Sequence, residues 1–483
     1  MKDKNEDMNS QSATVAQLKE TKSNFTLSAS SLPLLRWMLV IVLTALFIWL
    51  SSFFENPLHS RAFAIAALCL VLWLSEIVPS YVPTLLLWTL VPLLLSPLSG
   101  DYRLARVLAW AADPVLVLFL GGFTLSIAAS RYGLDQHLAR LALGWSRGSP
   151  FKLIALVMIA TAVLSMWMSN IAAAAMMLAG VRPLLARIEK SKPLRRALLL
   201  SIAIGADFGG ISTPIGTGPN GIAIAAVARI HSVTFLDWMV FALPLTVDLI
   251  IAGVLLISLR FYVSKSSGSE NFISIPSNSL SEDDTNRQRK EVWAVLIIFL
   301  LTISAWLSEQ LHGAPSGVVA LAATVLLFGS GLLKREDLAR IDWATLILIA
   351  GGITVGNLLE QTGLVRGLAT AVPWGEVNYF VRIFLLCFAS ALLSALMSNT
   401  ATATMLIPLA ASLDSSPSTT ILIAVSCSLG IPFVISTPPN AMVYGEGGLK
   451  TSDLLVPGLL LMIAGCVLIS LTGRFVLNLV GIP

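Results

Sequence analysis

The sequence predicts an all-α polytopic membrane protein with two inverted repeats, about 11 transmembrane helices and two re-entrant helical hairpins. Three observations support this fold class. Hydrophobic residues make up 56% of the 483 residues and charged residues only 12%, whereas a soluble globular protein carries about 25% charged residues. Apolar runs long enough to cross a bilayer as a helix recur along the chain. Four short motifs each occur twice, in the same order.

The chain begins with a polar segment of mixed charge, residues 1–33. It lacks the basic start and short apolar core of a secretory signal, so we expect a disordered cytoplasmic tail. The first apolar run, 35–53, is expected to be a retained span.

The remaining spans follow from the apolar runs. The expected full crossings, in chain order, are 35–53, 61–79, 82–98, 113–131, 197–229, 237–263, 291–309, 315–333, 343–364, 418–446 and 455–479. Segments 151–182 and 378–412 each contain "MSN" near the middle and are expected to be hairpins that enter and leave the membrane on one side.

Four motif pairs define the repeat. They are "WLSE" at 73–76 and 306–309, "GGFT" at 121–124 with "GGIT" at 351–354, "LSMWMSN" at 164–170 with "LSALMSN" at 393–399, and "TGPNG" at 217–221 with "TPPNA" at 437–441. The offsets are 233, 230, 229 and 220 residues. This near-constant spacing predicts two copies of one unit, 57–263 and 291–483, joined by the polar linker 264–290.

The charges indicate that the copies are inverted. The loop after the first "MSN" segment, 182–196, is rich in Arg and Lys, whereas the equivalent "SLDSSPST" has no basic residue. Cytoplasmic loops are enriched in Lys and Arg, so equivalent loops are expected on opposite sides. Inverted repeats are common in secondary transporters.

Each repeat contains two breaks in apolar sequence. One is the "MSN" turn, and the other is a Gly/Pro-rich stretch, "GGISTPIGTGPNG" from Gly209 or "GIPFVISTPPNA" from Gly430. Proline removes a backbone donor and disfavours helix before it, so spans 197–229 and 418–446 should each be two half-helices. Helix breaks at membrane depth are tolerated where protein or a cavity surrounds them. Their N-termini attract anions, and their carbonyl, Asn and Ser/Thr oxygens suit Na⁺.

The absence of basic residues near these breaks indicates ion coupling. No Lys, Arg or His occurs in 153–181, 197–228 or 383–444. A buried anion would lack a side-chain countercharge, which is costly. Co-bound cations would lower that cost, so anion–sodium coupling has a physical basis.

Some polar residues allow other interpretations. A lone Ser or Asn in a membrane helix can simply bond a neighbouring helix. Asp207, the only charge in span 197–228, is either linked to a cation or proton or lies at a helix interface, and Cys427 is expected at its place in the second half. Glu76 and Glu309 are expected at the membrane interface. The four Cys residues lie in apolar segments and the four His residues near segment ends, a pattern that does not predict a metal centre.

At the paired "SN" turns and "TxPN" loops the sequence resembles the divalent anion:sodium symporter (DASS, INDY-type) family of dicarboxylate and sulfate carriers, over about residues 35–483. The resemblance implies a homodimer whose transport domain moves as an elevator against a scaffold. It implies sodium-coupled symport of a divalent anion such as a C4-dicarboxylate or sulfate, with Na⁺ as the coupling ion and no cofactor. A bacterial inner (plasma) membrane location with a cytoplasmic N-terminus is expected, with the lipid bilayer as surroundings and no nucleic acid partner.

The resemblance also assigns domains and sites. The domains are the tail 1–33, scaffold helices 34–131, hairpin and broken helix of the transport domain 132–263, linker 264–290, scaffold helices 291–364, and the second hairpin and broken helix 365–483. The sodium ligands would be Ser165, Ser169, Asn170 and Gly216 in the first site, and Ser394, Met397, Asn399 and Ser436 in the second, where Met397 and Ser436 offer backbone carbonyls. The substrate contacts would be Ser169, Asn170, Thr217, Ser398, Asn399, Thr400, Thr437 and Pro438.

Two positions depart from the family pattern, both in the first half. Ile171 stands where the family has threonine, and Gly218 where it has the first of two prolines. The pocket is therefore expected to differ on one side.

Three other functions are alternatives to symport. A sodium-independent anion exchanger of the same fold is the main alternative. A channel is less well supported, because no ring of charged or carbonyl filter sequence is found. An intramembrane enzyme is not expected, because Asp207 alone cannot perform two-carboxylate chemistry.

Overall fold

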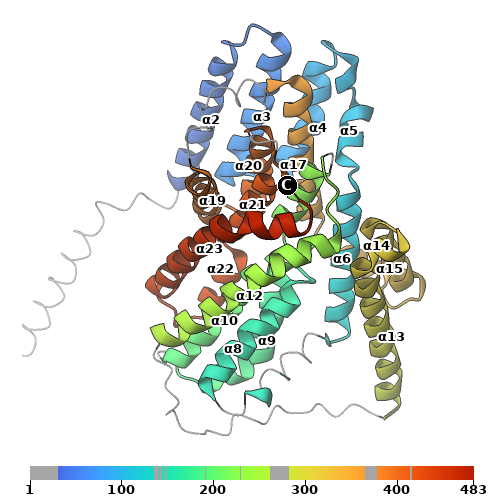
Figure 1. The fold of residues 1–483 in the computed structure, drawn as a ribbon, viewed down its shortest axis with the longest axis vertical. Helices are drawn as coiled ribbons and strands as arrows, with labels where there is room; N and C mark the ends of the chain where they lie inside the picture. Colours follow the sequence, from blue (N-terminus) through green and yellow to red (C-terminus); the bar gives the residue numbers. More distant parts are fainter. Residues whose placement is uncertain are drawn as a thin grey trace, which may run out of the picture.

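The computed structural model describes the chain except for residues 1–30, 135–140, 142–143, 147–148, 191, 229, 262–281, 365–377, 414–415 and 483. Most of the predicted tail 1–33 and of the linker 264–290 therefore lies outside the described residues. In the described part the regular structure is helical (Figure 1).

The described chain is divided among helices of very different length. They are α2 (Ser31–Ser51), α3 (Pro57–Ser75), α4 (Val82–Leu95), η1 (Gly100–Tyr102), α5 (Leu104–Ala111), α6 (Pro114–Arg131), α8 (Pro150–Ser165), α9 (Asn170–Arg187), α10 (Pro193–Gly209), η2 (Gly210–Ser212), α11 (Gly218–Val227), α12 (Phe235–Arg260), α13 (Glu282–Leu307), α14 (Glu309–His312), α15 (Ser316–Gly329), α16 (Arg335–Leu338), α17 (Trp343–Thr362), α19 (Tyr379–Leu396), α20 (Asn399–Leu413), α21 (Pro417–Cys427), α22 (Pro438–Gly445) and α23 (Thr451–Leu479).

Local sequence explains where several helices begin. Pro57, Pro114 and Pro150 each occupy the first turn of a helix, where the missing N–H costs no hydrogen bond. The residue before each proline is Asn, Asp or Ser, and its side chain accepts a bond from a free backbone N–H of that turn.

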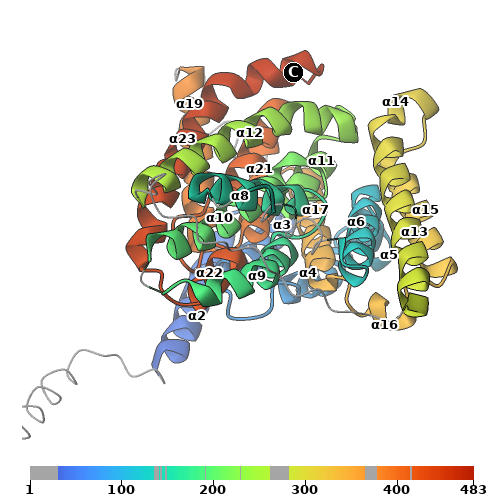
Figure 2. The same ribbon diagram turned by 90° about the horizontal axis from the view of Figure 1, so that it is seen from below.

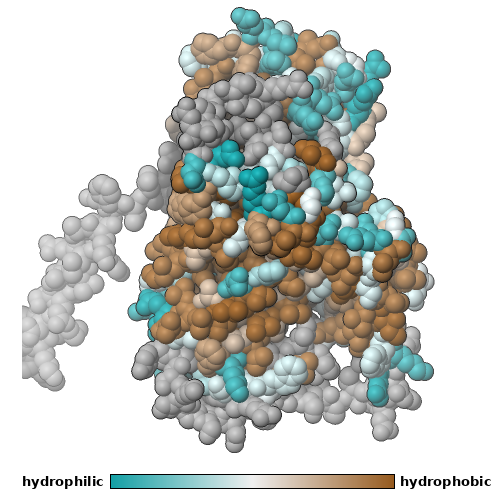
Figure 3. Space-filling model, viewed as in Figure 1, coloured by the Kyte–Doolittle hydropathy of each residue, from teal (hydrophilic) through white to brown (hydrophobic). Residues whose placement is uncertain are grey.

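Seven helices of the described chain are long and apolar enough to cross a membrane, and six shorter apolar helices accompany them. Hydrophobic side chains form a broad band across the visible face, while hydrophilic ones gather toward the upper end (Figure 3). The protein is an integral, polytopic α-helical membrane protein, as the sequence predicts.

The two predicted breaks in long spans are confirmed. Span 197–229 is divided into α10 and α11, with η2 and an irregular stretch between them. Span 418–446 is divided into α21 and α22 around the second proline-containing loop.

The two "MSN" segments form helix–turn–helix units. α8 and α9 are joined by a turn at residues 166–169, and α19 and α20 by residues 397–398. Met168 at the first tip and Met397 at the second are buried in hydrophobic clusters.

Several elements differ from expectation, of which α13 and α5 are the longest. α13 begins at Glu282, earlier than the predicted 291, because the charged run before residue 291 consists mostly of good helix formers that extend the span as helix. The short helix α5 was not predicted, because eight residues are too few to show as a membrane span.

Segments distant in sequence lie side by side. In Figures 1 and 2, α9 and α10 of the first half lie beside α22 of the second and α12 lies beside α23, whereas α13–α15 stand to one side. α2–α4 form a group at the upper end of the long axis in Figure 1, away from α8, α9 and α10.

Ion pairs tie the basic loop 182–196 to the second half. Arg182 Nη2 lies 2.7 Å from Glu446 Oε1, and Arg196 Nη1 lies 3.4 Å from Asp453 Oδ2. The predicted topology places both partners on the cytoplasmic side, so these contacts agree with it. The inverted orientation of the repeats itself stays a prediction.

Candidate functional site

The first turn is built around Ser165, Ser169 and Asn170. α8 ends at Ser165, whose hydroxyl oxygen lies 2.6 Å from the carbonyl oxygen of Ala206 and 2.9 Å from Asn170 Oδ1. Ser169 caps α9 by accepting a bond of 3.3 Å from the N–H of Ala172. The turn is thereby fastened to the end of α10.

The second turn repeats these contacts. Ser394 donates to the carbonyl oxygen of Cys427 and lies 2.8 Å from Asn399 Oδ1. Ser398 caps α20 by accepting a bond of 3.2 Å from the N–H of Ala401. The sequence similarity of the two turns is therefore a similarity of hydrogen bonds.

An asparagine fastens each proline-containing loop. Asn220 Nδ2 lies 3.0 Å from the carbonyl oxygen of Gly210, 3.3 Å from that of Ile211 and 2.8 Å from that of Thr213. Asn440 Nδ2 lies 2.9 Å from the carbonyl oxygen of Ile431 and 3.0 Å from that of Phe433. Unwound chain inside a membrane needs such partners. These two residues were not predicted as functional, although both stand in the quoted "PN" motifs.

Oxygen atoms converge at the first predicted sodium site. The Asn170 amide atom that faces Ser165 lies 2.9 Å from Ser165 Oγ, 3.2 Å from the carbonyl oxygen of Ala206 and 3.3 Å from that of Gly216. With Nδ2 in this place the amide donates to these oxygens. With Oδ1 in this place, four oxygens converge, and a cation can satisfy them. The structure thus brings together three of the four predicted first-site residues, while the Ser169 side chain serves as a helix cap.

The second predicted sodium site is similar in part. Ser394 and Asn399 are in direct contact, and Met397 is the extended residue that ends α19. Ser436 is buried in the loop, where its hydroxyl donates to the carbonyl oxygen of Phe433 at 2.7 Å and lies 3.3 Å from Asn440 Nδ2. The Asn440-anchored loop therefore positions Ser436.

The predicted substrate residues stand at four helix N-termini. α9 and α20 begin after Ser169 and Ser398, and α11 and α22 begin after Thr217 and Thr437. Thr217 and Thr437 are buried, Pro438 is exposed, and Ser169, Asn170, Ser398, Asn399 and Thr400 are partly buried. The turns are thus more accessible than Thr217 and Thr437.

The motifs of the two halves touch each other. A Cβ on Gly218 would overlap the side chain of Thr400, so the first loop packs directly against the second turn. This contact explains the departure from proline at position 218, because no side chain fits there.

Asp207 makes the second cross-contact. It is fully buried, and its Oδ2 accepts a bond of 2.9 Å from Thr437 Oγ1. Its Oδ1 lies 3.5 Å from Asn170 Nδ2. The expected equivalence with Cys427 is wrong by one residue: Ala206 and Cys427 offer their carbonyl oxygens to Ser165 and Ser394. The hydrogen bonds thus place Ser428 opposite Asp207.

Glu76 also reaches the site. It adopts a left-handed conformation (φ 49°) and is exposed, and its Oε1 accepts a bond of 3.1 Å from the N–H of Ser398. The equivalent Glu309 instead accepts a bond from the hydroxyl of Ser316. Glu76 therefore touches a predicted substrate turn, which the interfacial role expected for it did not include.

Trp167, at the tip of the first turn, was not predicted as a residue of the site. Its ring stacks at 6.1 Å on Phe235 and at 6.5 Å on Trp306, between α12 and α13. Ile171, one residue beyond the turn, is 46% exposed. Packing therefore does not enclose this side chain, and a different one can be accommodated.

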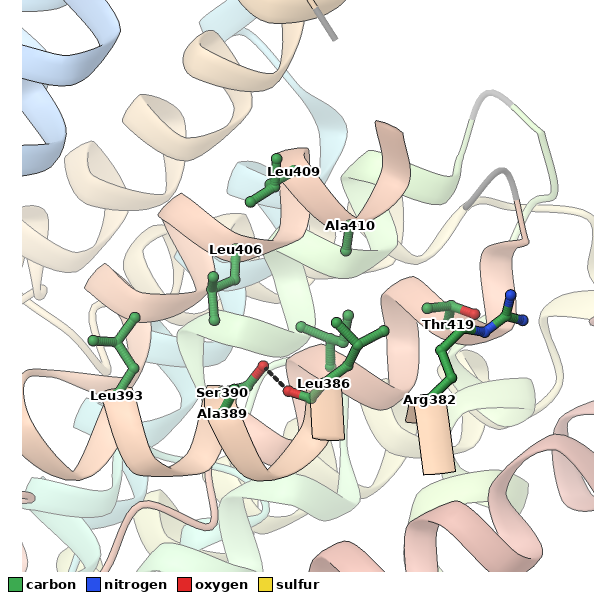
Figure 4. Close-up of a pocket in the computed structure, with 10 residues that line it drawn as sticks. Arg382, Leu386, Ala389, Ser390, Leu393, Leu406, Leu409, Ala410 and Thr419 are labelled. Carbon is green, nitrogen blue, oxygen red and sulfur yellow. Dashed lines mark hydrogen bonds between the residues drawn. The ribbon is translucent and has the colours of Figure 1, made fainter. Parts of the chain in front are cut away.

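A separate pocket lies between α19, α20 and α21 (Figure 4). Its lining is mostly aliphatic, and the hydroxyl of Ser390 donates to the carbonyl oxygen of Leu386 at 2.7 Å. None of the predicted sodium or substrate residues lines it.

Known proteins similar to this chain are transporters. A family model described as "Citrate transporter" (CitMHS) matches residues 70–418. An uncharacterized transporter of Haemophilus influenzae is 30% identical over 456 residues, covering 90% of this chain and 95% of that protein. The sodium-dependent dicarboxylate transporter SdcS of Staphylococcus saprophyticus is 27% identical over 450 residues, covering 83% of each.

Two further similarities are more distant in kind. The inorganic phosphate transporter PHO87 of Saccharomyces cerevisiae is 27% identical over 439 residues, and the chain spans 46% of its length. The YdaH transporter of Alcanivorax borkumensis, a crystal structure, superposes with a TM-score of 0.57 at 14% identity, covering 82% of this chain and 99% of that chain. This last similarity concerns the fold.

Proposed function

The chain belongs to the citrate transporter (CitMHS) family, and we propose that it is a secondary transporter that carries a divalent anion together with sodium ions. Family and relatives are membrane transporters and not enzymes. The dicarboxylate or sulfate-like nature of the anion, the sodium coupling and the moving element are parts of the proposal.

One observation carries the proposal: oxygens converge on Asn170 beside four helix N-termini. The cluster formed by Ser165, Asn170, Ala206 and Gly216 offers hydroxyl and carbonyl oxygens without a carboxylate, and an amide oxygen joins them when Asn170 Oδ1 faces Ser165. Such neutral oxygens suit a singly charged hard cation. The same contacts at Ser394 and Asn399 support a second cation site.

The anion would bind at the N-termini of α9, α11, α20 and α22. Free N–H groups at helix N-termini attract anions. The turn at Ser398 already holds one, because a carboxylate oxygen of Glu76 sits 3.1 Å from its N–H. This contact supports carboxylate binding at the second turn.

Coupling follows from charge. The segments that form the two turns and loops carry no Lys, Arg or His, so sodium ions would supply the positive charge that a dianion needs. Asn170 and Asn399 would belong to both kinds of site, which makes binding of one ion favour the other.

The proposal includes an elevator-like movement in a homodimer, with the N-terminus cytoplasmic. The two turns meet the predicted scaffold at Ser398, which bonds Glu76, and at Trp167, which packs on Trp306. Behind the second turn α20 packs along α17, a predicted scaffold helix, so a sliding movement would exchange this packing for new contacts.

A thermal-shift screen of the purified protein would identify the anion. Succinate, citrate, sulfate and phosphate are compared at equal concentration in sodium and in choline buffer. The proposal predicts that the true substrate raises Tm in sodium and much less in choline. Equal stabilisation in both buffers would contradict coupling.

The alternative is a sodium-independent exchanger of the same fold. Proteoliposomes loaded with counter-anion distinguish the two functions. An exchanger requires the internal anion, whereas a symporter takes up substrate into empty vesicles.

A further inference from the structure

The buried carboxylate of Asp207 has no role in the function proposed so far. It is 0% exposed and lies between the two halves of the site. Its Oδ2 is held by Thr437 Oγ1 at 2.9 Å, and its Oδ1 lies 3.5 Å from Asn170 Nδ2. It therefore touches a predicted sodium ligand of the first half and a predicted substrate contact of the second.

No fixed positive charge accompanies Asp207. Residues 197–228 contain no Lys, Arg or His, and none of the salt bridges among the described residues includes Asp207. A buried, uncompensated carboxylate is costly, and two neutral hydrogen bonds offset only part of that cost. The nearest place for a compensating cation is the oxygen cluster at Asn170.

Asp207 also determines how that cluster is arranged. A carboxylate favours the amide orientation in which Asn170 Nδ2 faces Asp207 Oδ1. Asn170 Oδ1 is then turned toward Ser165 Oγ and the carbonyl oxygens of Ala206 and Gly216. This arrangement is repulsive without a cation and suited to one. The opposite amide orientation satisfies the cluster by itself and leaves no place for an ion.

The second half lacks this charge. Ser428 occupies the equivalent place, and its buried hydroxyl has no hydrogen-bond partner among the described residues. The two predicted sodium sites therefore differ in electrostatics although their Ser–Asn contacts are alike.

We propose that Asp207 is the charge partner and positioning residue of the first sodium site. Resting on the proposed function, this inference states that the first sodium ion binds in the absence of substrate and more tightly than the second. Through Thr437, the same carboxylate connects this ion to the substrate loop of the other half. The dianion would then be compensated mainly by the sodium ion of the second site.

The test measures sodium-dependent thermal stability of the purified full chain without substrate, with choline chloride holding ionic strength constant. The variant is Asp207→Asn, which keeps the size and one of the two hydrogen-bond acceptors but removes the charge. Asp207→Ser, which introduces the residue type of the second half, is the second variant. Ser428→Ala is the matched control.

The inference predicts two effects of opposite direction. In sodium-free buffer, Asp207→Asn has the same Tm as the wild type or a higher one, because an uncompensated charge is gone. The sodium concentration for half-maximal stabilisation rises by about 10- to 100-fold, the usual effect of losing a partner of a metal ligand. Ser428→Ala keeps the sodium dependence of the wild type.

The remaining outcomes overturn the inference. Unchanged sodium affinity in Asp207→Asn would refute it and leave the proposed function intact. A lower sodium-free Tm in both Asp207 variants, or failure of both to fold, would show that Asp207 is a structural residue. A wild type that sodium does not stabilise at all would remove the proposed function and the inference with it.

Discussion

The N–H of Ser398 donates to a carboxylate oxygen of Glu76 at 3.1 Å, so the tip of the second turn is held by an anion of the protein itself. Glu76 reaches this position from a left-handed residue at the end of α3. Such a conformation is unfavourable for a side-chain-bearing residue and persists where the surroundings require it. The contact shows that a carboxylate fits at this N–H, and a substrate carboxylate in its place is part of the proposed function.

Replacing Glu76 with Gln should increase the apparent affinity for substrate, because Glu76 would compete with a substrate carboxylate for the N–H of Ser398. The neutral amide accepts a weaker bond from Ser398 than the carboxylate does, so a substrate anion displaces it more easily. We expect KM for uptake to fall by about 2- to 10-fold. Glu309→Gln is the matched control, because Glu309 bonds Ser316 instead. An unchanged KM in Glu76→Gln would argue against competition at this N–H.

Asn170→Ala and Asn399→Ala should each abolish transport while the protein stays folded. Each change removes an oxygen from a Ser–Asn pair of 2.9 or 2.8 Å. Sodium affinity should fall by more than about tenfold, measured by sodium-dependent thermal shift. Asn357→Ala is the control, since Asn357 bonds a carbonyl of its own helix. Normal uptake by either variant would remove the corresponding sodium site.

Gly218→Ala should destabilise the contact between the first loop and the second turn. The added Cβ overlaps the side chain of Thr400, and overpacking costs about 1–3 kcal/mol. We expect a lower Tm in detergent. In the Thr400→Ala background the same substitution should cost much less. Equal losses in both backgrounds would contradict the packing explanation.

Ile171→Thr should shift substrate preference toward dicarboxylates, because it restores the threonine hydroxyl that the family resemblance implies at this position. Ile171→Val is the matched control, since valine has the shape of threonine without the hydroxyl. Competition of unlabelled succinate against the best dianion measures the shift. Identical profiles for the two variants would assign no role to the hydroxyl.

Much of the fold follows from patterns that sequence carries directly. Apolar runs gave the positions of the helices, prolines marked the breaks between α10 and α11 and between α21 and α22, and repeated "SN" motifs located both turns. These signals are local, so each residue is interpreted from its neighbours in the chain.

The contacts between halves could not be predicted in this way. Asp207 with Thr437, Gly218 with Thr400 and Trp167 with Trp306 each join residues far apart in the sequence. Their types suit many environments, and packing alone decides which meet. The one-residue error in matching Asp207 to the second half has a different origin, because Asn220 follows Ala206 by 14 residues whereas Asn440 follows Cys427 by 13.

The most direct test of the account is sodium-driven uptake into empty proteoliposomes. With the dianion identified by thermal shift, an inward sodium gradient should accumulate it above the outside concentration. An equal choline gradient should give only the background of protein-free vesicles. Equal uptake in choline, dependent on internal counter-anion, would contradict sodium symport and establish exchange instead.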